Sequence, residues 1–132
     1  EALRKRFAHA IGALDISPNL YGVRMTEAAY SPEGAAWVDA LCAYLAGNAA
    51  VMAEGIAQIP GLSFMPMEST YLAWIDCSHL GEGAVPRNIF RERGVEVSPG
   101  PQFGSEGSGH VRLNMATSPA VLERIVTAMG DG

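Results

Sequence analysis

The spacing of apolar residues predicts helices at the start of the chain. Residues 2–14 carry apolar side chains every three or four positions, which is the period of a helix that buries one face. Residues 15–22, "DISPNLYG", are rich in turn-forming residues and predict a connection. A short helix is expected to follow over residues 23–30, "VRMTEAAY".

The clearest helical pattern covers residues 32–59. Ser31 is a candidate N-cap, and Pro32 occupies the first helical position, where its missing N–H has no intrahelical partner to lose. The pair Pro60-Gly61 marks the end. Because a single helix of this kind frays in water, we expect it to lie against other elements.

Strand-like and helical segments alternate over the rest of the chain. Strands are expected at 62–66, 70–77, 95–98 and 110–116, and helices at 85–94 and from 119 to about 130, with a glycine-rich loop over 99–109. The strand at 70–77 is apolar on both faces, which predicts that it is covered on both sides. The order predicts a small α/β (α+β-like) sandwich: one sheet of about four strands with helices packed on it.

Composition narrows the class of protein. The chain has 132 residues, of which 48% are hydrophobic and 17% charged, enough apolar material for a core. The net charge is −5, and no basic face of the kind that binds nucleic acid is visible. No apolar run approaches the roughly 18 residues of a membrane span, and no signal peptide is visible. We therefore expect a cytoplasmic protein with no nucleic-acid or membrane partner.

The cysteines and the first residue bear on the origin of the chain. Cys42 and Cys77 are far apart and form no CxxC motif, so we expect free, partly buried thiols in a reducing compartment. The chain begins at Glu1 rather than Met, and we expect its N-terminus to be a cleavage boundary or a chosen truncation.

Arg112 is the candidate functional residue that the strand pattern isolates. Alternation along 110–116 places Val111, Leu113 and Met115 on one face, and places Arg112 on the other with His110 and Asn114. Because burying an unpaired guanidinium is costly, Arg112 needs an anion or an open cleft. One hypothesis is a structural salt bridge to Glu68, Asp76 or Glu96. The other is a bidentate site for the carboxylate of a ligand.

Other candidate motifs are weak. A strand rather than a helix follows the loop 99–109, and the loop lacks GK[ST], so it is not a phosphate cradle. Cys77, His79 and His110 offer metal-ligand side chains without a recognised spacing, and we expect no metal site. Ser98, His110 and Asp76 are a trio that a chain of this size offers by chance, so no catalytic triad is predicted.

Three stretches together resemble a known enzyme family. They are "AAYSPEGAAWVDALCAYLAGN", "ESTYLAWIDCSHLG" and "GVEVSPGPQFGSEGSGHVRLNMATSP". They look like the C-terminal part of fold-type-I enzymes dependent on pyridoxal phosphate, within the class I/II aminotransferase superfamily, and are most similar to the MalY/PatB-type cystathionine β-lyases. The resemblance runs from about residue 15 to residue 120.

The resemblance implies roles for particular residues. The "RLN" at Arg112–Asn114 matches the motif whose arginine binds the α-carboxylate of an amino-acid substrate in these enzymes. The segment Ser17–Gly22, "SPNLYG", resembles a stretch near the dimer interface and the partner's active site. Asn19 and Tyr21 are candidate substrate-binding residues on that ground, and an ordinary connecting turn is the alternative.

The resemblance also implies a division of the chain. Residues 1–30 would be a remnant of the large domain with a connecting segment, and residues 31–132 would be the C-terminal small domain with the long linking helix 32–59. The expected partners are the chain's own large domain, the second subunit of a homodimer and a small amino-acid substrate.

One departure from the family affects catalysis. These enzymes bind pyridoxal phosphate as a Schiff base to a lysine, whereas the single lysine here, Lys5, matches no such motif. We expect the cofactor in the full-length parent and none on this chain, which would contribute no catalytic residue and be inactive alone. The resemblance implies the substrate-carboxylate-binding domain of a C–S β-lyase. The alternatives are the same domain of an aminotransferase, and a stand-alone, non-catalytic module that binds a carboxylate or a protein.

Overall fold

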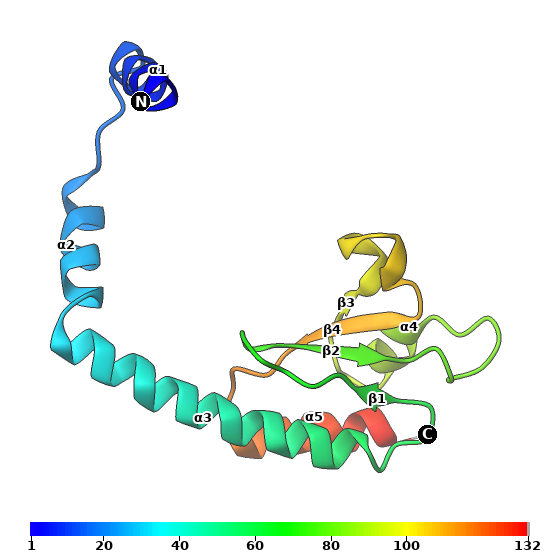
Figure 1. The fold of residues 1–132 in the computed structure, drawn as a ribbon. Helices are drawn as coiled ribbons and strands as arrows, with labels where there is room; N and C mark the ends of the chain where they lie inside the picture. The colour runs from blue at the N-terminus through cyan, green and yellow to red at the C-terminus, as the bar shows by residue number, and fades with distance from the viewer. Residues whose placement is uncertain (132) are drawn as a thin grey trace. The chain divides into compact units, whose positions relative to one another are not determined.

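A computed structural model of the protein describes residues 1–131. The chain forms two units, Glu1–Ala40 and Leu41–Gly132. Helix α3, Pro32–Ile56, begins in the first unit and continues into the second. Figure 1 shows the elements of both units.

The N-terminal unit consists of helices. Helix α1 is Ala2–Ala13 and helix α2 is Leu20–Ala29, followed by the start of α3. The predicted connection is shorter than expected because α2 begins three residues earlier, where the Asn19 side chain accepts a hydrogen bond of 2.8 Å from the Gly22 N–H. The predicted N-cap of α3 is confirmed, since Ser31 Oγ accepts from the Gly34 N–H at 3.1 Å.

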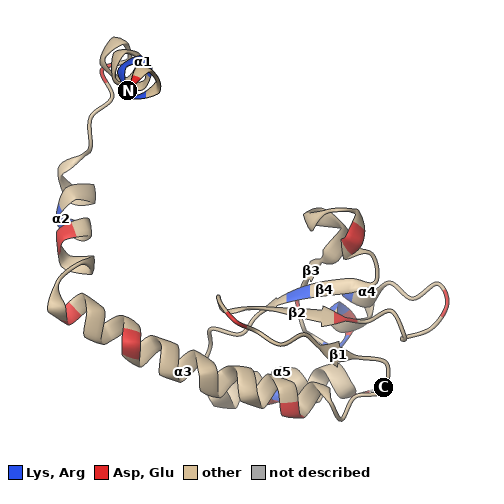
Figure 2. Cartoon of the chain, viewed as in Figure 1, with Lys and Arg blue, Asp and Glu red and all other residues tan. Residues whose placement is uncertain are grey.

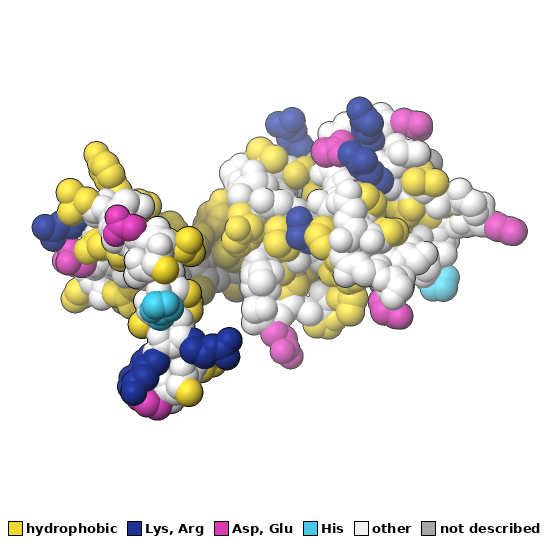
Figure 3. Space-filling model, turned by 90° about the horizontal axis from the view of Figure 1, so that it is seen from above, with side chains coloured by type: hydrophobic (Ala, Val, Ile, Leu, Met, Phe, Trp, Pro, Cys, Tyr) yellow, Lys and Arg dark blue, Asp and Glu magenta, His cyan; other side chains and the backbone are white. Residues whose placement is uncertain are grey.

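The helices of this unit leave their apolar side chains exposed. No residue of α1 or α2 is buried. Leu3 is 78% exposed and Phe7 65% exposed, although their spacing is that of a helix that buries one face. Figure 3 shows hydrophobic side chains on this surface. Within the described residues, these two helices therefore have no core of their own.

The C-terminal unit is built on a four-stranded sheet, as the sequence predicts, and the structure shows that its strands are antiparallel. The strands are β1 (Ser63–Phe64), β2 (Leu72–Asp76), β3 (Ser98–Pro99) and β4 (His110–Asn114), in the spatial order β1-β2-β4-β3. The outer strands are shorter than predicted, and β3 shares only Ser98 with the predicted strand at 95–98. Pro66 and Pro99 lack the N–H that would continue a ladder, which limits pairing at both edges.

One face of the sheet carries the core. Helix α5, Pro119–Gly130, and the C-terminal half of α3 lie side by side beneath this face (Figure 1). The core contains buried side chains from both central strands and from these helices: Ala73, Ile75, Val111, Leu113, Met115, Met52, Ile56, Leu122 and Met129. The alternation predicted for the last strand is therefore confirmed.

Helix α4, Pro86–Glu92, ends in a Schellman motif. Gly94 has a positive φ of 80°, the Gly94 N–H donates to the Arg91 carbonyl oxygen at 3.0 Å, and the Val95 N–H donates to the Phe90 carbonyl oxygen at 2.8 Å. Gly94 is thus the predicted C′ residue, and the motif turns the chain from α4 toward β3.

Helix α3 differs from prediction in two respects. It ends at Ile56 rather than 59, because the last turn tightens into i to i+3 bonds from the Gln58 and Ile59 N–H groups. Contrary to expectation, it is long and apolar enough to cross a membrane by length and composition alone. Most of α3 is not buried within the described residues; its buried side chains, Asn48, Met52 and Ile56, lie in the C-terminal unit.

The other face of the sheet is only partly covered. Leu72 and Trp74 on β2 are half-buried there, so the prediction that both faces of this strand are covered holds for one face only. The glycine-rich segment 99–109, predicted as an irregular loop, contains two short 3₁₀-helices, η1 (Gly100–Phe103) and η2 (Ser105–Gly107). This segment brings Phe103 to the open face, where Arg112 lies.

Candidate functional site

Arg112 lies at the centre of β4 on the open face of the sheet. It pairs across the ladder with Trp74 on β2 and with Ser98 on β3. Its neighbours along the strand, Val111 and Leu113, point into the core, so alternation directs Arg112 away from it. The side chain is half-buried, and Arg112 is the one lysine or arginine of β4, the strand that carries a blue segment in Figure 2.

Arg112 has no ion-pair partner within the described part of the chain, residues 1–131. Among residues 1–131, no carboxylate lies within 4.0 Å of its guanidinium. Of the three expected partners, Glu96 is paired with Arg87, and Asp76 accepts a hydrogen bond of 2.8 Å from the Ser78 N–H. Glu68 makes no ion pair within the same range of residues. The salt-bridge hypothesis is therefore not realised in this structure.

An aromatic ring contacts the guanidinium instead. The Cζ atom of Arg112 lies 4.2 Å from the centroid of the Phe103 ring. A cation above an aromatic face is attracted by the negative potential of the ring. Unlike a carboxylate, the ring does not use up the hydrogen-bond donors of the guanidinium, which remain available to an anion.

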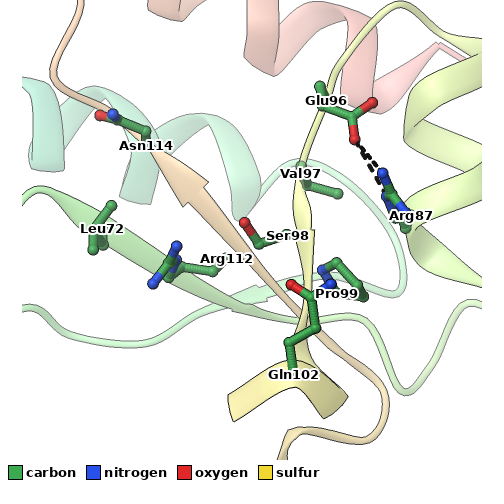
Figure 4. Close-up of a pocket in the computed structure, with 9 residues that line it drawn as sticks. All are labelled: Leu72, Arg87, Glu96, Val97, Ser98, Pro99, Gln102, Arg112 and Asn114. Carbon is green, nitrogen blue, oxygen red and sulfur yellow. Dashed lines mark hydrogen bonds and ion pairs between the residues drawn. The ribbon is translucent and has the colours of Figure 1, made fainter.

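Arg112 lines a cleft of about 270 Å³. In Figure 4, Arg112 and Asn114 reach the cleft from β4, Leu72 from β2 and Ser98 from β3, with Gln102 contributed by η1. The size and the mixed lining suit a small polar molecule held by a few directed groups.

A second basic residue of the cleft is already paired. Arg87 of α4 donates to Glu96 Oε1 from its Nη2 atom at 2.7 Å and from its Nε atom at 3.2 Å (Figure 4). The Arg87 hydrogen bond lowers the pKa of Glu96 below its usual range. Glu96 is therefore a paired anion, and Arg112 is the unpaired cation of the cleft among the described residues.

His110 and Asp76 occupy the same face nearer the end of β2. The His110 Nε2 atom lies 4.0 Å from Asp76 Oδ1, too far for a hydrogen bond, and the Nδ1 atom lies 2.9 Å from the Ser108 carbonyl oxygen. The Ser78 side chain and its backbone N–H lower the pKa of Asp76, with His110 contributing less. The side chains of Ser98, His110 and Asp76 are not joined by hydrogen bonds as a triad requires, within residues 1–131.

Cys77 follows β2 and lies on the core face of the sheet, whereas His110 lies on the other face. Its side chain is buried, and burial together with the Asp76 carboxylate raises the pKa of the thiol to about 12. Metal ligation needs a thiolate, and the described residues contain no cluster of three potential ligands. Cys42, in contrast, is exposed rather than partly buried as predicted, because it falls outside the buried stripe of α3.

The two other candidate residues belong to the N-terminal unit. Asn19 acts as the N-cap of α2, which gives it a structural role. Tyr21 is 81% exposed on the same helix. Their roles in substrate binding stay predictions.

The comparisons with known proteins identify the family. Residues 15–129 match the sequence profile of "Aminotransferase class I and II". The chain belongs to this family. It is 35% identical over 116 residues to protein MalY of Escherichia coli, covering 86% of this chain and 30% of that protein. It is 32% identical over 111 residues to cystathionine beta-lyase PatB of Bacillus subtilis, covering 80% of this chain and 28% of PatB.

A solved relative extends the match to the fold. The PLP-bound C-S lyase from Staphylococcus hominis superposes with a TM-score of 0.81 at 26% identity, covering 92% of this chain and 33% of that one. The resemblance to pyridoxal-phosphate enzymes of the cystathionine β-lyase kind is thus confirmed. The chain spans about a third of the length of the relatives it matches.

The residues of this chain do not fit pyridoxal phosphate by themselves. Enzymes of this kind hold the cofactor through a lysine and an acidic or basic partner at the pyridine nitrogen. Lys5, the single lysine, projects from α1 with its side chain 75% exposed and lies 3.9 Å from Glu1. No lysine lines the cleft around Arg112. We therefore assign no cofactor-binding role to the described residues.

Sequence reasoning missed the aromatic residues beside Arg112. Trp74 falls in an apolar run that reads as a buried strand, and Phe103 falls in a loop. One signal in the sequence could have indicated a role for Phe103. In "PGPQFG" this large apolar residue stands among turn-forming residues, which do not build a hydrophobic core. The strand pairing that brings Trp74 opposite Arg112 has no local signature in the sequence.

Proposed function

We propose that this chain is the substrate-binding C-terminal part of a pyridoxal-phosphate-dependent C–S β-lyase. In this proposal Arg112 binds the α-carboxylate of an amino acid that carries a sulfur substituent on Cβ. The observation that carries the proposal is the half-buried guanidinium of Arg112, which lines a cleft and has no ion-pair partner among residues 1–131.

The chemistry of arginine suits this role. The guanidinium is planar and charged at all physiological pH values, and two of its N–H groups match the two oxygens of a carboxylate. A bidentate pair fixes orientation as well as position, so the Cα–H bond of the bound amino acid is held in one direction. Half-burial strengthens the pair by excluding part of the water that would compete with it.

The rest of the active site would come from outside this chain. The cofactor would supply the electron sink that stabilises negative charge at Cα, and the lysine that holds it would belong to a preceding large domain. Asn19 and Tyr21 would lie near the site of a second subunit in a cytoplasmic homodimer. This chain would bind the substrate, orient it and form one wall of the cleft.

The test of Arg112 is a pair of substitutions in the full-length protein. Arg112→Ala removes the carboxylate partner, and Arg112→Lys keeps a charge without the planar fork. We expect Arg112→Ala to lower kcat/KM for a β-thioether amino acid by about a hundredfold or more, as for the loss of one partner of a desolvated charge pair, with the cofactor absorbance retained. The kcat/KM of Arg112→Lys should lie between that of the wild type and that of Arg112→Ala. Unchanged kinetics for both variants would refute the carboxylate role.

The reaction products separate the lyase from the aminotransferase. A β-lyase cleaves the Cβ–S bond and releases a thiol, pyruvate and ammonia without a second substrate. An aminotransferase returns a 2-oxo acid that keeps the sulfur substituent, and its turnover requires an acceptor 2-oxo acid. The names of PatB and of the S. hominis enzyme favour the lyase. A stand-alone binding module would bind the amino acid and give neither set of products.

A further inference from the structure

We propose that Phe103 is a positioning residue that sets the direction from which a carboxylate reaches Arg112. This inference rests on the carboxylate-binding role proposed above and adds a second residue to it. Phe103 acts through Arg112 and is not itself assigned a contact with the reacting atoms.

The first observation is the contact between the ring and the guanidinium. The Phe103 ring centroid lies 4.2 Å from Arg112 Cζ, so the cation lies over the face of the ring. The N–H donors of a guanidinium lie in its plane and point outward from its edge. Because the ring occupies the space on its own side of the cation, a carboxylate has to reach these donors from a side that the ring leaves open, where it can accept two parallel hydrogen bonds.

The second observation is that the Phe103 ring is itself held by aromatic neighbours. Trp74 meets Phe103 edge to face, with ring centroids 5.8 Å apart and an interplanar angle of 76°. The other partner of Trp74 is His110, which stacks on it at 5.5 Å with an angle of 16°. Both geometries are favourable for aromatic pairs. A row from His110 through Trp74 to Phe103 thus fixes the ring above the cation.

The third observation is the backbone that carries Phe103. Gly100 at the start of η1 and Gly107 at the end of η2 are both buried and touch each other. A Cβ atom added to either glycine would overlap the carbonyl oxygen of the other. The two ends of the segment are therefore closed against each other, which restricts where Phe103 can lie.

The fourth observation is that burial alone does not account for the position of Phe103. The residue is 47% exposed and is not part of the hydrophobic core. A half-exposed ring gains only part of the stabilisation that full burial of a phenylalanine provides. Its contacts with Arg112 and Trp74 are specific in geometry, as a positioning role requires.

The test compares Phe103→Leu with Phe103→Tyr in the full-length holoenzyme. Leucine keeps an apolar side chain and removes the aromatic face, whereas tyrosine keeps the face. The probe is methylthiopropionate, which has the carboxylate and thioether of a substrate but no amino group. We expect Phe103→Leu to raise the inhibition constant of methylthiopropionate by about three- to tenfold. The KM for the amino-acid substrate should rise by a similar factor, with a smaller change in kcat. Phe103→Tyr should stay within about twofold.

A double substitution separates this inference from the proposed function. If Phe103 acts through Arg112, Phe103→Leu should weaken probe binding in the wild-type background and have no further effect beside Arg112→Ala. An equal effect in both backgrounds would make Phe103 a merely structural residue and overturn the inference. Normal probe binding by Phe103→Leu would also overturn it. If Arg112→Ala alone leaves probe binding unchanged, the proposed function fails instead.

Two controls protect these results from effects on folding. Val121→Ala changes an exposed apolar side chain on α5, at the other face of the sheet, and should leave probe binding unchanged. The midpoint temperature of thermal unfolding of each variant should lie close to that of the wild type. If Phe103→Leu does not fold, Phe103→Met replaces it, because methionine is longer and more adaptable. The same loss of probe binding is expected, and normal probe binding or an equal effect beside Arg112→Ala would again overturn the inference.

Discussion

The side-chain amide of Asn48 on α3 donates a hydrogen bond of 2.8 Å to the carbonyl oxygen of Met115, just beyond the end of β4. The same amide nitrogen donates to the Thr117 carbonyl oxygen at 3.0 Å. Asn48 is 1% exposed and is the polar residue in the buried set of the described chain. It ties the long helix to the strand that carries Arg112.

We expect Asn48→Ala to lower the free energy of unfolding by about 1–3 kcal/mol, because two hydrogen bonds from a buried amide are lost. Each carbonyl oxygen keeps one other donor, the Thr117 N–H for Met115 and the Tyr44 hydroxyl for Thr117. Urea denaturation measures this change. Gln58→Ala, at an exposed site past the end of the same helix, should change the stability by less than about 0.5 kcal/mol. Equal midpoints for the wild type and Asn48→Ala would contradict the structural role of this amide.

Two glycines in α3 should respond in opposite directions to alanine. Gly47 has open space where a Cβ would lie, so Gly47→Ala should stabilise the protein by up to about 1 kcal/mol through helix propensity. At Gly55 a Cβ would overlap the Val126 side chain of α5, so Gly55→Ala should destabilise it by about 1–3 kcal/mol. Thermal unfolding of both variants measures the difference. Stabilisation by Gly55→Ala as well as by Gly47→Ala would mean that α3 and α5 are not packed as closely as the structure shows.

The two thiols should differ in reactivity. Alkylation requires the thiolate. Cys42 is exposed, whereas burial raises the pKa of Cys77 to about 12, so Cys77 stays protonated and shielded at about pH 8. Iodoacetamide should therefore modify Cys42 in the native protein and reach Cys77 only after unfolding. Mass spectrometry of the two peptides distinguishes the sites. Equal modification before unfolding would contradict the packing of Cys77 under the sheet.

Asp76 should contribute to acid sensitivity. Its pKa is lowered in the folded state, chiefly by the hydrogen bonds from Ser78, so folding favours the ionised carboxylate. That contribution is complete above the unfolded pKa of about 4 and is lost as the pH falls through the lower, folded value. The stability of Asp76→Asn should therefore fall less than that of the wild type over this acid range.

Urea midpoints measured from neutral to acid pH test the role of Asp76. Glu82→Gln removes a carboxylate that is exposed in the loop before α4 and should leave the acid dependence close to that of the wild type. Parallel curves for the wild type and Asp76→Asn would show that the Ser78 hydrogen bonds do not stabilise the ionised form.

The elements that the sequence predicted correctly are those fixed by local periodicity. The 3.6-residue spacing after Ser31 identified α3, and alternation over 110–116 identified which side chains of β4 face the core. Both signals reflect backbone geometry within one segment. They were less reliable at the ends of elements, where hydrogen bonds from Asn19 and the tightened last turn near Ile56 decide the boundary.

Sequence alone also left the exposed surface of α1 and α2 unresolved. The apolar spacing of Leu3 and Phe7 predicts a buried face, yet both are exposed in this chain. Helical periodicity indicates an apolar face that packs against another element. It does not indicate whether that element belongs to the same 132 residues.

By itself, the sequence determined that Arg112 stands in a strand on the face opposite the core, because the two-residue period of a strand requires it. Only the tertiary structure decided what Arg112 meets there. The Phe103 ring lies above the guanidinium and Trp74 lies opposite on β2, while Glu96 is paired with Arg87. These contacts join residues of different elements, and they depend on strand register, loop closure and competition among charges, none of which is encoded in the period of a single element.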